Sequence, residues 1–168
     1  MKKVIKCGQF FDSNTGKVLK DIAVVIDGNK ITEVAPAADV CCKDAEVIDL
    51  SGKFVMPGLI DAHVHINMNG EASMQYAVTS DATAAINSMI YAQRDLMAGF
   101  TTLRDEGAQG YSDVAVRDAI NAGKIVGPRI SCSGEAIGGT GGHADSHFLP
   151  CVTGKHAFGQ IIDGPDAG

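Results

Sequence analysis

Two histidines stand one residue apart in the segment LIDAHVHINMNG, residues 59–70, at the end of an apolar run. In a β-strand, residues two apart point to the same face, so Asp61, His63 and His65 are expected to line one face. Two imidazoles placed in this way can bind one divalent ion, at about 2.0–2.1 Å in the case of zinc. Neutral imidazole also suits nickel, iron and manganese, so the pair does not name the metal.

The histidine pair has a second interpretation, in which both imidazoles are ordinary polar side chains of a strand. A bare His-x-His pattern is weak evidence, because short motifs occur by chance. The apolar context favours a metal, since buried ring nitrogens need partners. Asp61 or a bound water could also supply those partners. The sequence therefore predicts a metal site of which the two histidines form only a part.

The elements that would position these histidines change in type near residue 57. Residues 1–56 contain short β-branched runs separated by turns and show no helical period. Asp27-Gly28-Asn29 predicts a hairpin, and Ser51-Gly52 is expected to separate two further short strands. We therefore expect a small all-β, sandwich-like unit over residues 1–56.

Strands alternate with helices over residues 57–168. The apolar run at 59–66 is typical of a strand buried on both faces of a parallel sheet. Gly99 and Gly123 mark the ends of two helices, and Ser112 or Asp113 is expected as the N-cap of the second. The expected helices span about 83–98 and 112–122, and further strands are expected at 100–105 and 128–134. This order predicts an α/β region with a parallel sheet.

Composition excludes several classes of protein. Hydrophobic residues make up 45% of the 168 residues and charged residues 20%, as in globular proteins. A net charge of -6 without a Lys/Arg run argues against a nucleic-acid partner. No apolar stretch approaches the roughly 20 residues of a membrane helix, and the N-terminus has no signal-peptide pattern. Five cysteines without CxxC spacing predict a reduced, cytoplasmic chain.

The segment VIDLSGKFVMPGLIDAHVHI, residues 47–66, resembles the entry signature of the amidohydrolase superfamily. In that superfamily a β-rich unit leads into a metal-dependent (β/α)8 TIM-type barrel. Three later segments, AGFTTLRDEG, GPRISCSGEAIGGTGGHAD and DGPD, resemble the branch of Xaa-Pro dipeptidase-like and imidazolonepropionase-related enzymes. The resemblance implies hydrolysis of a peptide or amide bond in a small amide or dipeptide substrate, with a divalent metal, expected to be zinc.

The resemblance also implies roles for single residues. His63 and His65 correspond to ligands of the more buried metal. His143 corresponds to a histidine near the substrate's α-carboxylate, which a cation and free amides of the loop at 138–142 would suit. An ordinary loop histidine is an equally open interpretation of His143. No residue is assigned as catalytic.

Other polar residues are given supporting roles or none. Arg104 and Asp105 are expected to form a structural pair behind the site. The residues without an assigned role are His147, His156, Glu106 and Asp145.

The family's remaining ligands have no counterpart in residues 1–168. They are a carboxylated lysine after the fourth strand, two histidines after the fifth and sixth, and an aspartate after the eighth. A (β/α)8 barrel needs about 250 residues, so the chain is expected to be the N-terminal portion of an incomplete barrel, inactive alone and with weak metal binding or none. Its open edge predicts a homo-oligomer or an element-swapped assembly.

Two alternatives stay open. One is a cyclic-amide hydrolase or deaminase of the same superfamily with one metal, which a missing fourth-strand lysine would favour. The other is a non-enzymatic binding or assembly module, which a stop codon directly after Gly168 would favour.

Overall fold

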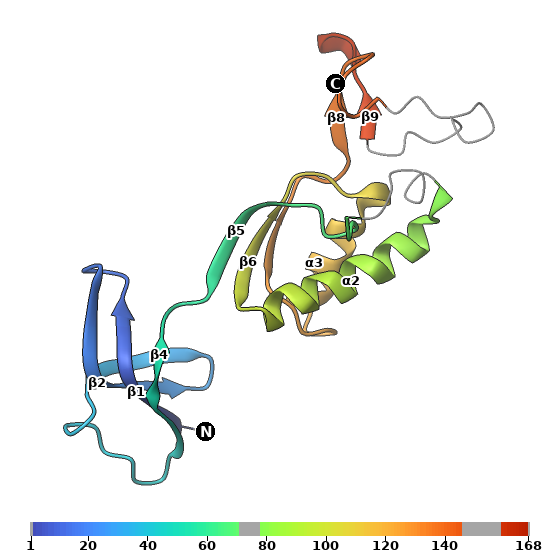
Figure 1. The fold of residues 1–168 in the computed structure, drawn as a ribbon. Helices are drawn as coiled ribbons and strands as arrows, with labels where there is room; N and C mark the ends of the chain where they lie inside the picture. The colour runs from blue at the N-terminus through green and yellow to red at the C-terminus, as the bar shows by residue number, and fades with distance from the viewer. Residues whose placement is uncertain (1, 71–77, 146–158, 168) are drawn as a thin grey trace. The chain divides into compact units, whose positions relative to one another are not determined.

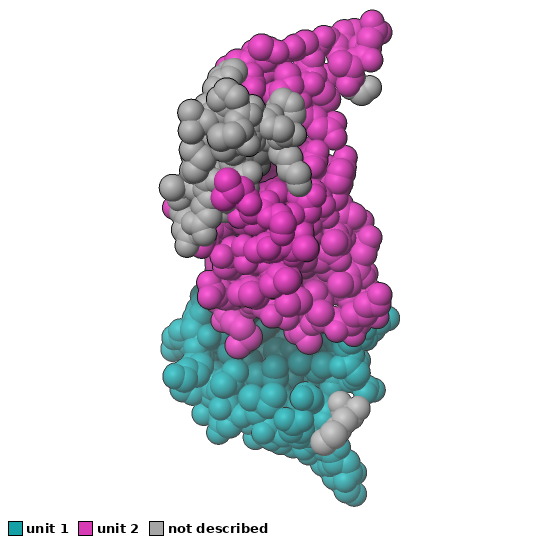
Figure 2. Space-filling view, turned by 90° about the vertical axis from the view of Figure 1, so that its right-hand side faces the viewer, with its two compact units in different colours: residues 1–57 teal, residues 58–168 magenta. Residues whose placement is uncertain are grey.

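The computed structural model describes residues 2–70, 78–145 and 159–167. The chain divides into two compact units, residues 1–57 and residues 58–168 (Figures 1 and 2). The first is built from strands, and the second from strands alternating with helices, as the sequence predicts. None of the helices in the described ranges is long and apolar enough to cross a lipid bilayer.

Unit 1 is a four-stranded sheet with the strand order β3-β2-β1-β4. Its strands are β1 (Lys2–Asp12), β2 (Lys17–Asp27), β3 (Lys30–Pro36) and β4 (Glu46–Val55). β1 and β2, and β2 and β3, are antiparallel, whereas β1 and β4 are parallel. The core residues of the unit are Val4, Ala23, Val25 and Val40. The described residues form one sheet here, whereas a sandwich-like unit would need two.

Of the two turns predicted in unit 1, one is present and the other is not. Asp27 pairs with Lys30, so the predicted hairpin is present, with Gly28 at a φ of 61° in its turn. Ser51-Gly52 does not separate two strands, because β4 continues through it along β1. The register between the two strands shifts at Gly8, where an added Cβ would lie 1.9 Å from the Ser51 carbonyl oxygen.

Unit 2 begins with a parallel three-stranded sheet in the order β5-β6-β7. The strands are β5 (Leu59–Val64), β6 (Phe100–Asp105) and β7 (Arg129–Cys132). Helices α2 (Asp81–Met97) and α3 (Ser112–Asn121) connect them and cover the same face of the sheet (Figure 1). The predicted β-α-β-α-β order is therefore confirmed.

Shorter elements complete unit 2. β8 (Ala136–Gly138) and β9 (Gly159–Ile161) form a separate parallel pair. Two 3-10 turns, η1 (Gln109–Tyr111) and η2 (Pro165–Ala167), precede α3 and follow β9.

The structure confirms both glycines predicted at the helix ends and adds an N-cap of α2 that the sequence did not predict. Helix α2 is capped by the Ser80 side chain, and Gly99 follows it at a φ of 104°. Gly123 follows α3 at a φ of 68°. The predicted side-chain cap of α3 is wrong, because Tyr111 in a left-handed conformation occupies the N-cap position. The Asp113 carboxylate instead accepts a hydrogen bond from the backbone of Gly134, at 3.0 Å.

The core of unit 2 lies between the sheet and its two helices. Ile66, Ala92, Leu103, Val116 and Ile130 form its buried cluster. The prediction that the run at 59–66 is buried on both faces is wrong in this structure. Leu59 is 42% exposed and Ile60 69% exposed, because β5 is an outer strand of the three-stranded sheet.

Candidate metal site

The two predicted metal ligands come together at the C-terminal end of β5. His63 lies in the strand, and His65 directly follows its last residue, Val64. The rings meet edge to face, with their centroids 5.5 Å apart. Two imidazoles on one tetrahedral ion, each about 2.1 Å from it, have centroids roughly 5 Å apart. The observed separation therefore suits a shared ion.

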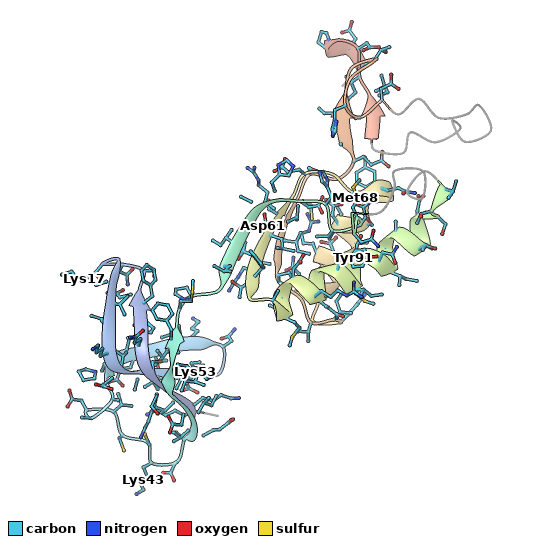
Figure 3. The ribbon with its side chains drawn as sticks, in the orientation of Figure 1. Lys17, Lys43, Lys53, Asp61, Met68 and Tyr91 are labelled. Atoms are coloured by element: carbon cyan, nitrogen blue, oxygen red, sulfur yellow. The ribbon has the colours of Figure 1, made fainter. Side chains whose placement is uncertain are left out.

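A local irregularity of β5 contributes to this arrangement. Asp61 pairs with Leu103 and Val64 with Asp105, so β5 contains one more residue than β6 between these pairs. An extra residue of this kind bends a strand and re-aims its side chains. Asp61, which Figure 3 labels on β5, accepts a hydrogen bond from the backbone N–H of His63 at 3.1 Å. Its carboxylate therefore supports the main chain at the site.

His65 has one ring nitrogen already engaged. Its Nδ1 lies 2.8 Å from the backbone carbonyl oxygen of Gly107. A carbonyl oxygen only accepts, so Nδ1 must carry the hydrogen, and the neutral ring keeps its lone pair on Nε2. Histidines that bind metals almost always donate their other N–H to a carbonyl or carboxylate. The bonding of His65 therefore fits a metal ligand that binds through Nε2.

The carbonyl that holds His65 belongs to a loop fixed by Asp105. This residue ends β6 and is 1% exposed. Its carboxylate accepts hydrogen bonds from the backbone N–H groups of Ile66 and Gly107, each at 2.8 Å. Burial raises the pKa of Asp105, while the two backbone hydrogen bonds oppose that rise. The sequence predicts a structural role for Asp105 and misses its link to His65, which depends on contacts between separate strands.

The predicted pairing of Arg104 with Asp105 is wrong. Arg104 donates from Nε to the carbonyl oxygen of Ala62, at 2.7 Å, and forms an ion pair with Glu106. Adjacent residues of a strand point to opposite faces, so the side chains of Arg104 and Asp105 diverge. The alternation of side chains between the two faces of the strand FTTLRD is the sequence signal that places Arg104 and Asp105 on opposite faces. Glu106, to which the sequence assigns no role, is thus the partner of Arg104.

The described residues provide only part of a metal site. Within residues 2–70, 78–145 and 159–167, no group of three or more His, Cys, Asp or Glu side chains could hold a metal ion. Ordinary zinc sites have three or four protein ligands. The structure therefore brings together two candidate ligands, His63 and His65, without a third from these ranges.

The loop that carries His143 differs from its prediction. The amide of Thr140 donates to Asp163 and the amide of Gly141 to Asp145, each at 2.8 Å. The Gly142 amide donates to a neighbouring carbonyl oxygen. These three amides are therefore occupied by the chain's own groups and are not free for a substrate carboxylate.

The aspartate Asp163, which holds this loop, lies beyond β9 and is remote in sequence, so local reasoning could not pair it with Thr140. His143 is exposed, and its substrate-binding role stays a prediction. His147 and His156 lie outside the described residues.

Comparisons with known proteins agree with the fold and show the family. The sequence profile of the amidohydrolase family matches residues 54–157, more than half of the chain. Ochratoxinase of Aspergillus niger is 31% identical over 155 residues, which cover 89% of this chain and 32% of that protein. Dihydroorotase of Pelotomaculum thermopropionicum is 40% identical over 85 residues, which cover 51% of this chain and 19% of that protein.

A solved structure gives the same answer at the level of the fold. A prolidase complexed with N-methylphosphonate-L-proline is 35% identical and superposes with a TM-score of 0.80. The match covers 98% of this chain and 41% of the prolidase. The chain thus spans less than half the length of each of these three proteins. The family profile includes β5 and both histidines of the pair. The chain belongs to the amidohydrolase family.

Proposed function

We propose that this chain is the N-terminal part of a metal-dependent hydrolase that cleaves a peptide or amide bond in a small substrate. The observation that carries the proposal is the hydrogen bond from His65 Nδ1 to Gly107, which leaves the lone pair of Nε2 available in a ring whose centroid lies 5.5 Å from that of His63. The likeness to a prolidase supports a dipeptide as the substrate class.

The proposed fold is the beginning of a (β/α)8 barrel. Three parallel strands in sequential order, with both connecting helices on one face, are what the first repeats of such a barrel require. Active sites of these barrels lie at the C-terminal ends of the strands. His65 and Asp105 both stand at such ends, of β5 and β6 respectively.

His63 and His65 would hold a divalent ion, for which we propose zinc. When bound, such an ion lowers the pKa of a water molecule and polarises the scissile carbonyl group. Within the chain, Gly107 holds the His65 ring in place, while the exposed ring of His63 can reach the same ion. His143 would meet the substrate's carboxylate from its exposed loop.

The likeness to dihydroorotase favours a second candidate, the hydrolysis of a cyclic amide. Both reactions need the histidine pair and differ in the substrate. A panel of substrates therefore separates them more directly than any substitution in the metal site.

The test is an assay of the protein encoded by the whole reading frame that contains this sequence, loaded with Zn²⁺. We expect release of amino acid from Xaa-Pro dipeptides or N-acyl amino acids, abolished by chelation and by His63→Ala. His143→Ala is the matched control, because it should raise KM for substrates with a free carboxylate and leave metal content unchanged. Hydrolysis of cyclic amides alone would establish the second candidate, and no metal-dependent hydrolysis of either class would refute both.

A further inference from the structure

Asp105 fixes the main chain on two sides of His65 at once. One carboxylate oxygen accepts from the backbone of Ile66, the residue directly after His65, at 2.8 Å. The other accepts at 2.8 Å from the backbone of Gly107, whose carbonyl oxygen holds the His65 ring. A single buried side chain thus connects the peptide next to the histidine with the residue that binds its imidazole.

We propose that Asp105 is a positioning residue, which sets the ring orientation and the tautomer of His65 through the Gly107 carbonyl group. The effect of this role on metal binding rests on the proposed function, because it requires His65 to be a metal ligand. The hydrogen bonds themselves are formed by the chain without any ion.

The Gly107 peptide would otherwise have freedom to turn its carbonyl away. Gly107 has a φ of 149°, a conformation that side chains rarely adopt, and an added Cβ would lie 2.9 Å from the Ala136 side chain. Its N–H is held by Asp105, and the next N–H, of Ala108, donates to the carbonyl oxygen of Gly134 at 2.9 Å. Both sides of the carbonyl that meets His65 are therefore anchored.

A carboxylate is the side chain that this arrangement requires. Both partners of Asp105 are N–H donors, so the side chain must offer two acceptor oxygens. Asparagine has the same shape but only one acceptor oxygen, and its NH₂ group would face an N–H donor. Asp105→Asn therefore breaks one of the two bonds while it preserves the volume of the side chain.

Ser88→Ala provides a control for a general loss of stability. Ser88 is fully buried in α2, and its hydroxyl oxygen lies 2.8 Å from the Ala84 carbonyl oxygen and 3.0 Å from the Ser112 hydroxyl oxygen. The hydrogen bonds of Ser88 do not connect to His65. Its removal should lower stability without altering the imidazole.

The experiment measures the tautomer of His65 by long-range ¹H–¹⁵N NMR in the metal-free 168-residue chain, and then the Zn²⁺ affinity. We expect the Nδ1–H tautomer in the wild type and in Ser88→Ala, and a shift toward Nε2–H in Asp105→Asn. The Zn²⁺ dissociation constant should rise about 10- to 100-fold in Asp105→Asn alone, the usual effect of losing a group that orients a metal ligand.

Three results would overturn the proposal. They are an Nε2–H tautomer in the wild type, an unchanged tautomer in folded Asp105→Asn, and an equal shift in Ser88→Ala. The first of these needs no variant, so the proposal stays testable if Asp105→Asn does not fold. A wild type with the expected tautomer that fails to bind Zn²⁺ would leave the positioning role of Asp105 standing, because two ligands alone are expected to hold zinc weakly or not at all.

Discussion

His65 shows how much of the site depends on a single hydrogen bond. The bond from its Nδ1 to Gly107 selects the tautomer that suits a metal ligand. His63 contributes the second imidazole, with its centroid 5.5 Å away. At the scale of residues, the chemistry of the site therefore requires the two histidines and the loop that orients one of them.

Cys132 should be an unreactive thiol. Burial, followed by the nearby Asp113 carboxylate, raises the pKa of Cys132 to about 12. The thiolate is the reactive form, and at pH 8 only roughly one thiol in ten thousand with such a pKa is ionised. We expect iodoacetamide to label the exposed Cys41 much faster than Cys132, as measured by peptide mass spectrometry. Equal rates in the folded chain would contradict this, and equal rates in urea are the control.

Residue types and spacing were sufficient to predict that the rings of His63 and His65 lie close together. They were not sufficient to predict the role of Asp105, because its partners Ile66 and Gly107 are brought together by the pairing of two strands. The ion-pair partner of Arg104 is a different case, because Glu106 lies only two residues away and the alternation along β6 already separates Arg104 from Asp105. For Asp105, contacts between elements, rather than residue identities, were the missing information.

At the scale of elements, the loop after β8 is closed by Thr140 and Asp163. The Thr140 hydroxyl and amide both donate to this carboxylate and lower the pKa of Asp163 below its usual value of 3.8. A lowered pKa means that the stabilisation is present above pH 3.8 and is lost as the pH falls through the pKa in the folded chain.

Thr140→Ala removes the hydroxyl and keeps the amide, so the pKa of Asp163 should rise toward its usual value. NMR titration of the side-chain carboxyl carbons measures this change. Asp12, whose pKa is lowered mainly by the Thr15 hydroxyl, is the internal control and should not respond. A titration of Asp163 that is the same with and without the Thr140 hydroxyl would show that this bond does not form.

The register shift between β1 and β4 depends on Gly8. Gly8→Ala would place a Cβ 1.9 Å from the Ser51 carbonyl oxygen, and overpacking of this kind destabilises by about 1–3 kcal/mol. Gly52→Ala is the matched control, since an added Cβ there meets nothing within 4 Å. Urea unfolding should show a clearly lower stability for Gly8→Ala alone. Equal midpoints for the two variants would contradict the close approach of the strands.

The type and order of the elements could be predicted, whereas several of their boundaries could not. The two helices were predicted, and glycines marked their ends at Gly99 and Gly123. The N-cap of α3 was mispredicted because Asp113 binds Gly134, a tertiary partner. Ser51-Gly52 was mistaken for a strand boundary because a turn and a register shift use the same residue types.

At the scale of the whole molecule, the second unit exposes apolar side chains and sheet edges. β5 and β7 are the outer strands of the three-stranded sheet. Met97 is 86% exposed and Val126 74% exposed, and both line one shallow pocket. Open edges and apolar patches favour association. We expect light scattering at micromolar concentration to give a mass above the 17.5 kDa of one chain. A strictly monomeric species would contradict this expectation.

The central claim is that His63 and His65 bind one metal ion together. The most direct test is a Zn²⁺ titration of the 168-residue chain, followed through the NMR signals of both imidazoles. We predict that the two rings respond together, weakly and with one affinity, and that His63→Ala weakens the response of His65, whereas His143→Ala does not. Rings that respond independently, or not at all at millimolar Zn²⁺, would contradict the claim.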